Sequence, residues 1–321
     1  MTAPMLKISS RAALIAGLVV VAAAATSLPR RVHNTRDARV SPRAADSTVV
    51  LLLGTGMPRP NPNASGPATA VLVGSRVFLF DAGAGVMRQI AAARLPINGV
   101  TALFITHLHT DHTLGYPDLI FTTWVMGRKH PLEAYGPHGL KRMTDDIIAA
   151  WSEDEDIRVN GLEHERADGY SVNVHEIAPG VVYDSGGVRI TAFPVQHGSW
   201  KEAYGYRVDT PTRSVVVSGD TRPSKSLVAA SRNVDVLVHE VYSAARLAPE
   251  NRPGGSDWPQ YMHESHTSDV ELGRIAAAVN PKLLVLTHII RMGSTDSALV
   301  RGIREGGFKG PVEVGRDLQR Y

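Results

Sequence analysis

The amino-acid sequence predicts a mixed α/β domain that occupies residues 47–321. The chain has 321 residues, of which 43% are apolar, and this is enough to bury a core. From residue 47 onward, short β-branched runs alternate with stretches of helical spacing, and no internal repeat interrupts them. We therefore expect one domain in which strands and helices share a single core.

Short apolar or β-branched runs that end in turn residues predict the strands. These runs cover residues 48–53, 70–74, 76–80, 101–106, 188–195, 204–208, 214–218, 234–238 and 283–286. The first run ends in the turn signal Gly54-Thr55-Gly56, and the second and third have the spacing of a hairpin. The run 101–106 is mostly apolar and predicts a buried strand.

Helical spacing predicts helices over residues 87–95, 117–127, 139–151 and 268–279. Ser268 and Glu271 have the spacing of a capping box, and Asn280-Pro281 predicts the end of that helix. Residues 153–187 are polar and rich in turn residues, which predicts weak strands. Residues 248–265 are rich in Gly, Pro, Trp and His and predict a long functional loop.

The first 46 residues differ in character from the rest of the chain. Lys7 and Arg11 precede a small and apolar run over residues 12–25. This run is too short for a membrane span of about 20 residues but has the length of a signal-peptide core. We expect a signal peptide over residues 1–26, a polar linker over 27–46, and a periplasmic or secreted protein without a stable membrane anchor. The alternative is an uncleaved anchor helix.

Composition excludes several classes of function. Cysteine is absent, which excludes disulfide scaffolds, thiol catalysis and thiolate metal ligands. Seven bases and two acids fall in residues 1–46, which leaves 27 bases and 29 acids for the body of the chain. A nearly neutral body argues against a large polyanionic partner.

The strongest chemical signal is the stretch Thr106-His107-Leu108-His109-Thr110-Asp111-His112, directly after a predicted strand. Its histidines and its aspartate are potential metal ligands, too many for one ion but suited to two adjacent ions. Imidazole and carboxylate are the ligands that zinc takes when no thiolate is available. The stretch therefore predicts a metal site rather than a histidine-rich surface turn.

These residues and four further motifs resemble the metallo-β-lactamase-fold hydrolases. The further motifs follow in the family's order and are Phe80-Asp81-Ala82-Gly83, Val195-Gln196-His197-Gly198, Ser218-Gly219-Asp220-Thr221 and Leu286-Thr287-His288. The resemblance covers about residues 47–321 and implies a four-layer αββα sandwich. It also implies that one zinc ion binds His107, His109, His197 and Asp220, and that a second binds Asp111, His112, Asp220 and His288. Asp81 is a candidate partner for a ligand histidine.

The finer resemblance is to the ribonuclease Z and arylsulfatase-like branch. It is carried by Leu53-Gly54-Thr55-Gly56, Tyr135-Gly136-Pro137-x-Gly139, His239-Glu240 and His266-Thr267. In that branch the later histidine works near the leaving group and the glutamate steadies it, which implies these roles for His266 and Glu240. The two ions would present hydroxide at neutral pH, and Asp111 would orient it and accept its proton.

Two departures from the branch narrow the expected substrate. The tRNA-processing enzymes carry an arm inserted between the third metal motif and the shared aspartate, and the distance from His197 to Asp220 leaves no room for one. With the nearly neutral body and the expected export, this makes tRNA an unexpected substrate. Composition and Asp220 also argue against the β-lactamases, whereas lactonases keep the same ligands and stay open.

The sequence therefore predicts an exported dinuclear zinc hydrolase that cleaves a phosphodiester or an aryl sulfate ester in a small or short anionic substrate. The alternatives are a lactonase or another carboxylic ester or amide hydrolase, and a metal-bound module without turnover. A homodimer is compatible with the sequence. Aromatic residues could line a pocket near the metals, namely Trp124, Trp200, Trp258 and Tyr261.

Overall fold

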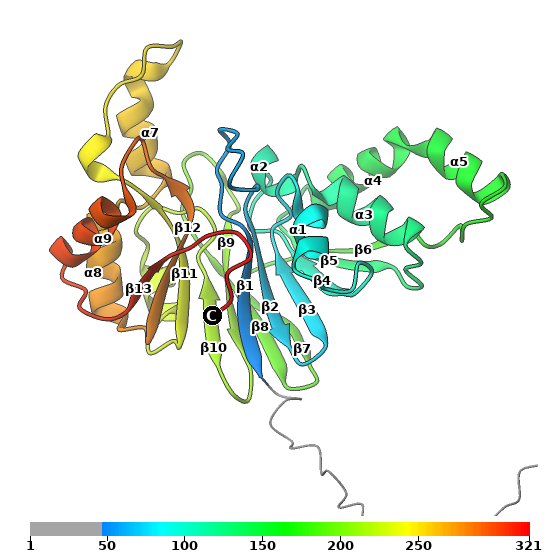
Figure 1. Cartoon of the computed structure of the whole chain (residues 1–321), viewed down its shortest axis with the longest axis horizontal. Helices are drawn as coiled ribbons and strands as arrows, with labels where there is room; N and C mark the ends of the chain where they lie inside the picture. Colours follow the sequence, from blue (N-terminus) through cyan, green and yellow to red (C-terminus); the bar gives the residue numbers. More distant parts are fainter. Residues whose placement is uncertain (1–46) are drawn as a thin grey trace, which may run out of the picture. The chain divides into compact units, whose positions relative to one another are not determined.

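The computed structural model describes residues 47–321. One six-stranded and one seven-stranded sheet form the centre of this part of the chain (Figure 1). In spatial order the first sheet holds β1 (Thr48–Gly54), β2 (Ala68–Val73), β3 (Arg76–Phe80), β4 (Val100–Phe104), β5 (Leu132–Gly136) and β6 (Val172–Glu176). The second holds β13 (Val312–Val314), β12 (Leu283–Ile290), β11 (Val236–Tyr242), β10 (Ser214–Val217), β9 (Tyr204–Asp209), β8 (Val188–Pro194) and β7 (Gly180–Ser185).

Each sheet is antiparallel in one part and parallel in the other. Strands β1 to β3 pair antiparallel, and β3 to β6 pair parallel. Strands β7 to β10 pair antiparallel, and β10 to β13 pair parallel. In parallel strands the carboxyl ends meet at one edge of a sheet, which is where α/β proteins place their ligands.

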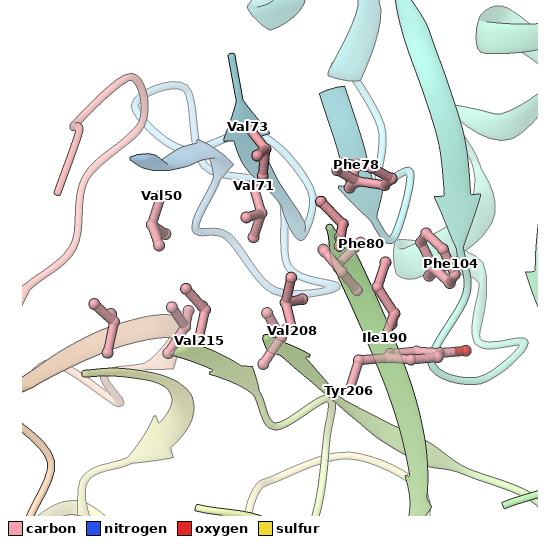
Figure 2. Packing of buried hydrophobic residues seen from close by; sticks show 14 of the residues in the cluster. Val50, Val71, Val73, Phe78, Phe80, Phe104, Ile190, Tyr206, Val208 and Val215 are labelled. Carbon is pink, nitrogen blue, oxygen red and sulfur yellow. The ribbon is translucent and has the colours of Figure 1, made fainter. Parts of the chain in front are cut away.

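The space between the two sheets is filled by the alternate apolar residues of their strands. Val50 and Phe80 of the first sheet face Val208 and Val215 of the second, all of them buried (Figure 2). Their neighbours along β1, such as Leu51, point to the opposite face of the first sheet. The β-branched runs of the sequence are therefore apolar throughout because both faces of each sheet are covered.

Helices cover the outer face of each sheet. The first sheet packs against α1 (Val86–Ala92), α3 (Tyr116–Val125) and α4 (Leu140–Ala150). The second packs against α6 (Lys225–Ala230), α8 (Asp269–Val279) and α9 (Asp296–Glu305). The order of layers is helix, sheet, sheet and helix, so the predicted αββα sandwich is confirmed.

The structure corrects the sequence-based elements in two segments. Residues 153–187, expected to hold only weak strands, also hold most of helix α5 (Ser152–Asn160). Residues 248–265, expected to be a loop, hold a short 3₁₀ helix and α7 (Trp258–Ser265). Helices α6 and α9 and strand β13 were not predicted. The proposed signal peptide and linker, residues 1–46, lie outside the described residues, and no helix within residues 47–321 has the length and apolar character to cross a membrane.

The capping box predicted for α8 is present. Ser268 accepts a hydrogen bond from the backbone N–H of Glu271, and the Glu271 side chain accepts one from the N–H of Ser268. Ser268→Ala should therefore lower the free energy of unfolding by about 1 kcal/mol, measured by urea denaturation. Ser256→Ala, at an exposed position, is the control. Equal stability of the two variants would contradict a stabilising cap.

Candidate metal centre

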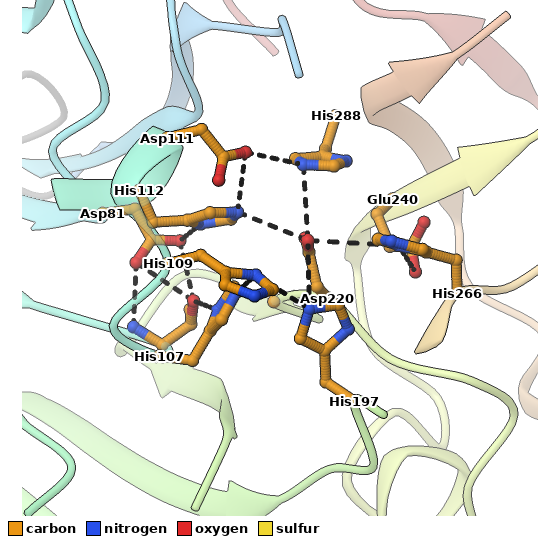
Figure 3. A network of polar contacts seen from close by, with 12 residues as sticks. Asp81, His107, His109, Asp111, His112, His197, Asp220, Glu240, His266 and His288 are labelled. Atoms are coloured by element: carbon orange, nitrogen blue, oxygen red, sulfur yellow. Dashed lines mark hydrogen bonds and ion pairs between the residues drawn. The ribbon is translucent and has the colours of Figure 1, made fainter. Parts of the chain in front are cut away.

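The side chains expected to bind metal converge at the carboxyl ends of strands from both sheets (Figure 3). His107 and His109 follow β4, and Asp111 and His112 lie on the short helix α2 (Thr110–Thr113). The second sheet supplies the rest, with His197 after β8, Asp220 after β10, and His288 within β12. Segments that lie as far apart as Asp111 and His288, 177 positions, thus meet because the two sheets pack face to face.

One group of potential ligands consists of His107, His109, His197 and Asp220, whose ligand atoms all lie within 4.8 Å of one another. His109 Nδ1 lies 2.9 Å from His107 Nε2 and 3.1 Å from His197 Nε2. Asp220 Oδ2 lies 3.9 Å from His197 Nε2. All of these except His109 are fully buried, so the group forms a closed cluster of nitrogens around one carboxylate oxygen.

The second group consists of Asp111, His112 and His288. His288 Nε2 lies 3.2 Å from Asp111 Oδ2 and 3.3 Å from Asp220 Oδ2, and His112 Nε2 lies 3.4 Å from Asp220 Oδ2. The same oxygen of Asp220 therefore faces both groups. The structure brings together every residue that the resemblance implied as a ligand, and it also places His266 beside Asp220 and His288 as a third possible group.

The residues fit metal ions on two grounds. Donor atoms about 2.0–2.2 Å from a tetrahedral ion lie roughly 3.3–3.6 Å apart, close to the spacing between Asp220 and the rings of His112 and His288. In addition, His112 Nε2 is buried and has no hydrogen-bond partner, although it points at the carboxylates of Asp111 and Asp220. Since a buried polar atom is normally paired, this nitrogen is suited to a metal ion.

The charges of the first group also suit metal binding, whereas in the second group burial acts to lower the pKa of His112 and of His288 but Asp220 outweighs it and raises both. Burial lowers the pKa of His107 and of His109, and it lowers the pKa of His197 to about 4, so these rings are neutral at pH 7. Neutral imidazole is the form that binds metal ions. Burial opposes the ionised form of Asp220, but His288 and His112 outweigh it and hold the pKa of this carboxyl well below its ordinary value. Asp220 is thus a carboxylate.

Asp81 contacts His112 directly and His107 through Thr106, whereas the sequence indicated it as a partner for one ligand histidine. Its carboxylate accepts a hydrogen bond from His112 Nδ1 at 2.8 Å and from the hydroxyl of Thr106 at 2.9 Å. Thr106 Oγ1 in turn lies 3.0 Å from His107 Nδ1. Both rings therefore carry their proton on Nδ1 and present Nε2 to the centre. The sequence did not indicate Thr106, nor the carbonyl of Ser265 that holds His197 Nδ1 at 2.7 Å.

Asp81→Asn should weaken zinc binding by roughly 10- to 100-fold, measured by competition with a chelator. Asparagine tolerates the left-handed backbone of position 81, whose φ is 61°. Its amide NH₂, however, would face a group that also donates, because Thr106 and His112 both donate to this carboxylate. The control is Asp118→Asn on α3, and comparable losses in both variants would show that the Asp81 contacts do not set affinity.

Glu240 and His266 form a separate pair beside Asp220. His266 Nδ1 lies 3.2 Å from Glu240 Oε1 and 3.9 Å from Asp220 Oδ2, and both side chains are buried. The same oxygen of Glu240 accepts hydrogen bonds from the backbone N–H groups of Thr221 and Thr267, at 3.1 Å each. The glutamate is therefore fixed, and it leaves His266 Nε2 as the ring nitrogen available to another group.

A cavity of about 1100 Å³ opens on this cluster. His109, Asp111, Asp220, His266 and His288 line it, together with Arg59, Arg246, Arg252, Arg291 and Arg316. Of the aromatic residues proposed for such a pocket, Trp258 and Tyr261 line it, and the Trp200 indole N–H donates to His109 Nε2 at 2.8 Å. Trp124 does not line it, because it is a buried residue of α3 whose indole N–H donates to the carbonyl of Arg166.

The fold and the cluster define a metal-dependent hydrolase with histidine and aspartate ligands. The family model for the beta-lactamase superfamily domain matches residues 76–289. The chain belongs to this metallo-β-lactamase superfamily and, within it, to the ribonuclease Z branch. It is 34% identical over 276 residues to the ribonuclease Z of Mycobacterium sp. (strain KMS), covering 84% of this chain and 94% of that protein.

A second relative and two solved structures are also similar to this chain. The ribonuclease Z of Mycobacterium bovis (strain BCG / Pasteur 1173P2) is 32% identical over 275 residues, covering 84% of this chain and 96% of that protein. Two solved structures share the fold. The protein YhfI from Bacillus subtilis has a TM-score of 0.66 and 20% identity, over 86% of this chain and 99% of that one. The short form of human tRNase Z has a TM-score of 0.64 and 23% identity, over 85% of this chain and 98% of that one.

These relatives correct the predicted function, an exported phosphodiester or aryl sulfate ester hydrolase: they support a metal-dependent phosphodiesterase and give no support for export or for an aryl sulfate ester. The relatives are named ribonuclease Z, and the match to this chain covers nearly their whole length. The structure agrees that no arm is inserted here, since in the described residues β9 and β10 are joined by residues 210–213 alone. The absence of an arm does not set the chain apart from this branch. The charge argument averaged over the whole body, whereas five arginines line the cavity.

Proposed function

We propose that the chain is a zinc-dependent ribonuclease that hydrolyses a phosphodiester bond in RNA. The observation that carries this proposal is the cavity, in which the histidine and aspartate cluster lies beside Arg59, Arg246, Arg252 and two further arginines. RNA presents a row of phosphates to such a surface, and arginine is the side chain best suited to phosphate. A neutral lactone would gain nothing from these charges. The names of the relatives, ribonuclease Z and tRNase Z, support the same substrate class.

Two zinc ions are part of this proposal. His107, His109, His197 and Asp220 would hold one ion, and Asp111, His112 and His288 would hold the other together with Asp220. Such a pair of ions lowers the pKa of water and offsets the negative charge of a phosphodiester.

The other steps fall to side chains of the chain itself. Asp111 is buried, borders the cavity and holds an ionised carboxylate, so it can orient the attacking water and accept its proton. As the water oxygen bonds to phosphorus, the ester bond to the departing sugar oxygen breaks. His266 Nε2 can give a proton to that oxygen, while Glu240 holds the ring in place through Nδ1.

The test is RNA cleavage by zinc-loaded protein. We expect the wild-type chain to cleave a tRNA precursor with a 3′ extension, and we expect a chelator to stop the reaction. An unstructured RNA of the same length shows how far the folded tRNA body contributes to recognition. Products are resolved by denaturing electrophoresis.

Asp220→Ala protein purified in parallel is the control for contaminating ribonucleases. If wild-type protein cleaves neither RNA faster than this variant, yet hydrolyses a lactone or an amide with bound zinc, the proposal is wrong. Cleavage of RNA that persists after the chelator would equally contradict it.

A further inference from the structure

One wall of the cavity is built by the segment that follows β11. We call its four cavity-lining side chains Arg246, Arg252, Trp258 and Tyr261 the arginine–aromatic wall. Sequence patterns predicted a loop here, but the structure gives two short helical turns and α7, which carry Arg246, Trp258 and Tyr261, while Arg252 lies in the loop between the two turns.

The two aromatic rings and one arginine of this wall form a layered stack. The Trp258 and Tyr261 rings have centroids 5.3 Å apart and an interplanar angle of 20°, as expected for residues three apart on a helix. The guanidinium of Arg252 lies 5.1 Å from the Trp258 ring. Trp258 also packs against the apolar cluster of Tyr242, Met262 and Ile290, which anchors the stack.

Tyr261 lies at the end of the stack nearest to the reacting groups. Its ring centroid is 5.7 Å from that of His266, edge to face, and 40% of the residue is exposed. An exposed aromatic side chain inside a cavity, with its ring held on one side by Trp258, offers a planar surface to a ligand. Because His266 is proposed to serve the departing oxygen, this surface lies on the leaving-group side.

Charge on the same wall indicates what the ligand carries. Glu250 pairs with Arg252 at 2.6 Å and with Arg59 at 3.4 Å, so these two arginines share one carboxylate. Arg246 is exposed and forms no ion pair with any residue in the described range 47–321. The wall therefore combines an aromatic surface with a cation that is free to meet a phosphate.

We infer that the arginine–aromatic wall is a nucleotide subsite, in which the base of the nucleoside on the leaving-group side stacks on Tyr261 and a phosphate meets Arg246. This inference rests on the proposed ribonuclease function and adds to it the position of one base. Stacking accepts every base, because each has a flat aromatic face. The subsite would thus anchor the RNA next to the cut without reading its sequence.

A binding experiment tests the subsite without any turnover. Zinc-loaded protein is titrated calorimetrically with uridine monophosphate and with ribose 5-phosphate, which has the same phosphate but no base. We expect the nucleotide to bind roughly 10-fold more tightly, and Tyr261→Leu to remove that difference. Arg246→Gln should weaken both ligands alike.

Trp151→Leu is the matched control, because Trp151 is also an exposed aromatic residue, but it lies between α4 and α5 and does not line the cavity. This variant should keep the preference for the nucleotide. Equal affinities of the wild-type protein for the two ligands would overturn the subsite, and so would a preference that survives in Tyr261→Leu.

A cleavage experiment places the base. The substrates are the dinucleotide UpU and two analogues that each lack one base, on either side of the single phosphodiester bond. We expect loss of the leaving-side base to raise KM the most, and Tyr261→Leu to raise KM for UpU to the value of that analogue. Equal effects of the two missing bases would overturn the placement. If no RNA or dinucleotide is cleaved at all, the proposed function fails, and the binding experiment still decides whether the subsite exists.

Discussion

Asp220→Ala should abolish hydrolysis, lowering kcat/KM by roughly 10³-fold or more, and should lower the affinity for both metal ions. The reason is the position of one atom. Asp220 Oδ2 lies 3.3 Å from His288 Nε2, 3.4 Å from His112 Nε2 and 3.9 Å from His197 Nε2, so both groups of ligands share it. Removing this carboxylate leaves two neighbouring cations without the charge between them.

Metal content and turnover are measured on the same samples. After zinc reconstitution and dialysis, elemental analysis should find close to two ions per wild-type chain and fewer in Asp220→Ala. The control is Asp146→Ala, which removes an exposed carboxylate on α4 whose ion pair within residues 47–321 is with Arg142. If Asp220→Ala keeps both ions, or if the two variants lose activity equally, the assignment of Asp220 is wrong.

The cluster of histidines and an aspartate after one apolar strand indicated a metal site, and the resemblance to the metallo-β-lactamase fold implied the more distant residues. His107, His109, Asp111 and His112 lie within six positions, and a strand-ending motif carries each of His197, Asp220 and His288. A strand in a sheet that is covered on both faces is a continuous apolar run. The sequence therefore shows where such a strand ends and which polar residue follows it. The structure then brings these strand ends to one edge.

The parts that the sequence did not predict depend on contacts between distant segments. The Ser265 carbonyl holds the ring of His197, 68 positions earlier, and no pattern along the chain encodes such a pair. Helix α7 has a proline in its first turn and a Gly-rich approach, so its composition resembles a loop. The sequence offered no way to tell Trp124 from Trp258 as a pocket residue. Trp124 lies buried in the helix layer, whereas Trp258 lines the cavity.

The charge of the chain shows the same limit. The body carries nearly equal numbers of acids and bases, and the average suggests no polyanionic partner. Folding brings arginines from five different positions to one cavity, where Glu250, Asp317 and the aspartates of the cluster also lie. The partners of these arginines are few. Glu250 pairs with Arg59 and Arg252, and Asp296 pairs with Arg291 and Arg316. Local charge at the site, rather than net charge, determines which substrate the cavity can attract.

His266→Ala should slow the reaction in a way that depends on the leaving group. A nitrophenolate departs as a stable anion, whereas the sugar oxygen of RNA departs as an alkoxide and needs a proton in the transition state. General-acid assistance is worth roughly 10²- to 10⁴-fold. We therefore expect a loss of this size in kcat/KM for a dinucleotide and a much smaller loss for bis-nitrophenyl phosphate.

Glu240→Gln should show the same bias more weakly, because Glu240 acts only through His266 Nδ1, at 3.2 Å. Zinc content should stay unchanged in both variants, since the seven proposed ligands include neither residue, although His266 also lies near Asp220 and His288 in a third possible group. Loss of zinc in His266→Ala would assign His266 to that group. His130→Ala at an exposed position serves as the histidine control. A loss by the same factor for good and poor leaving groups would mean that His266 binds substrate or packs rather than donating a proton. In that case the Glu240–His266 pair would give no reason to prefer a phosphodiester with an alkoxide leaving group, and the arginines of the cavity alone would carry the substrate class.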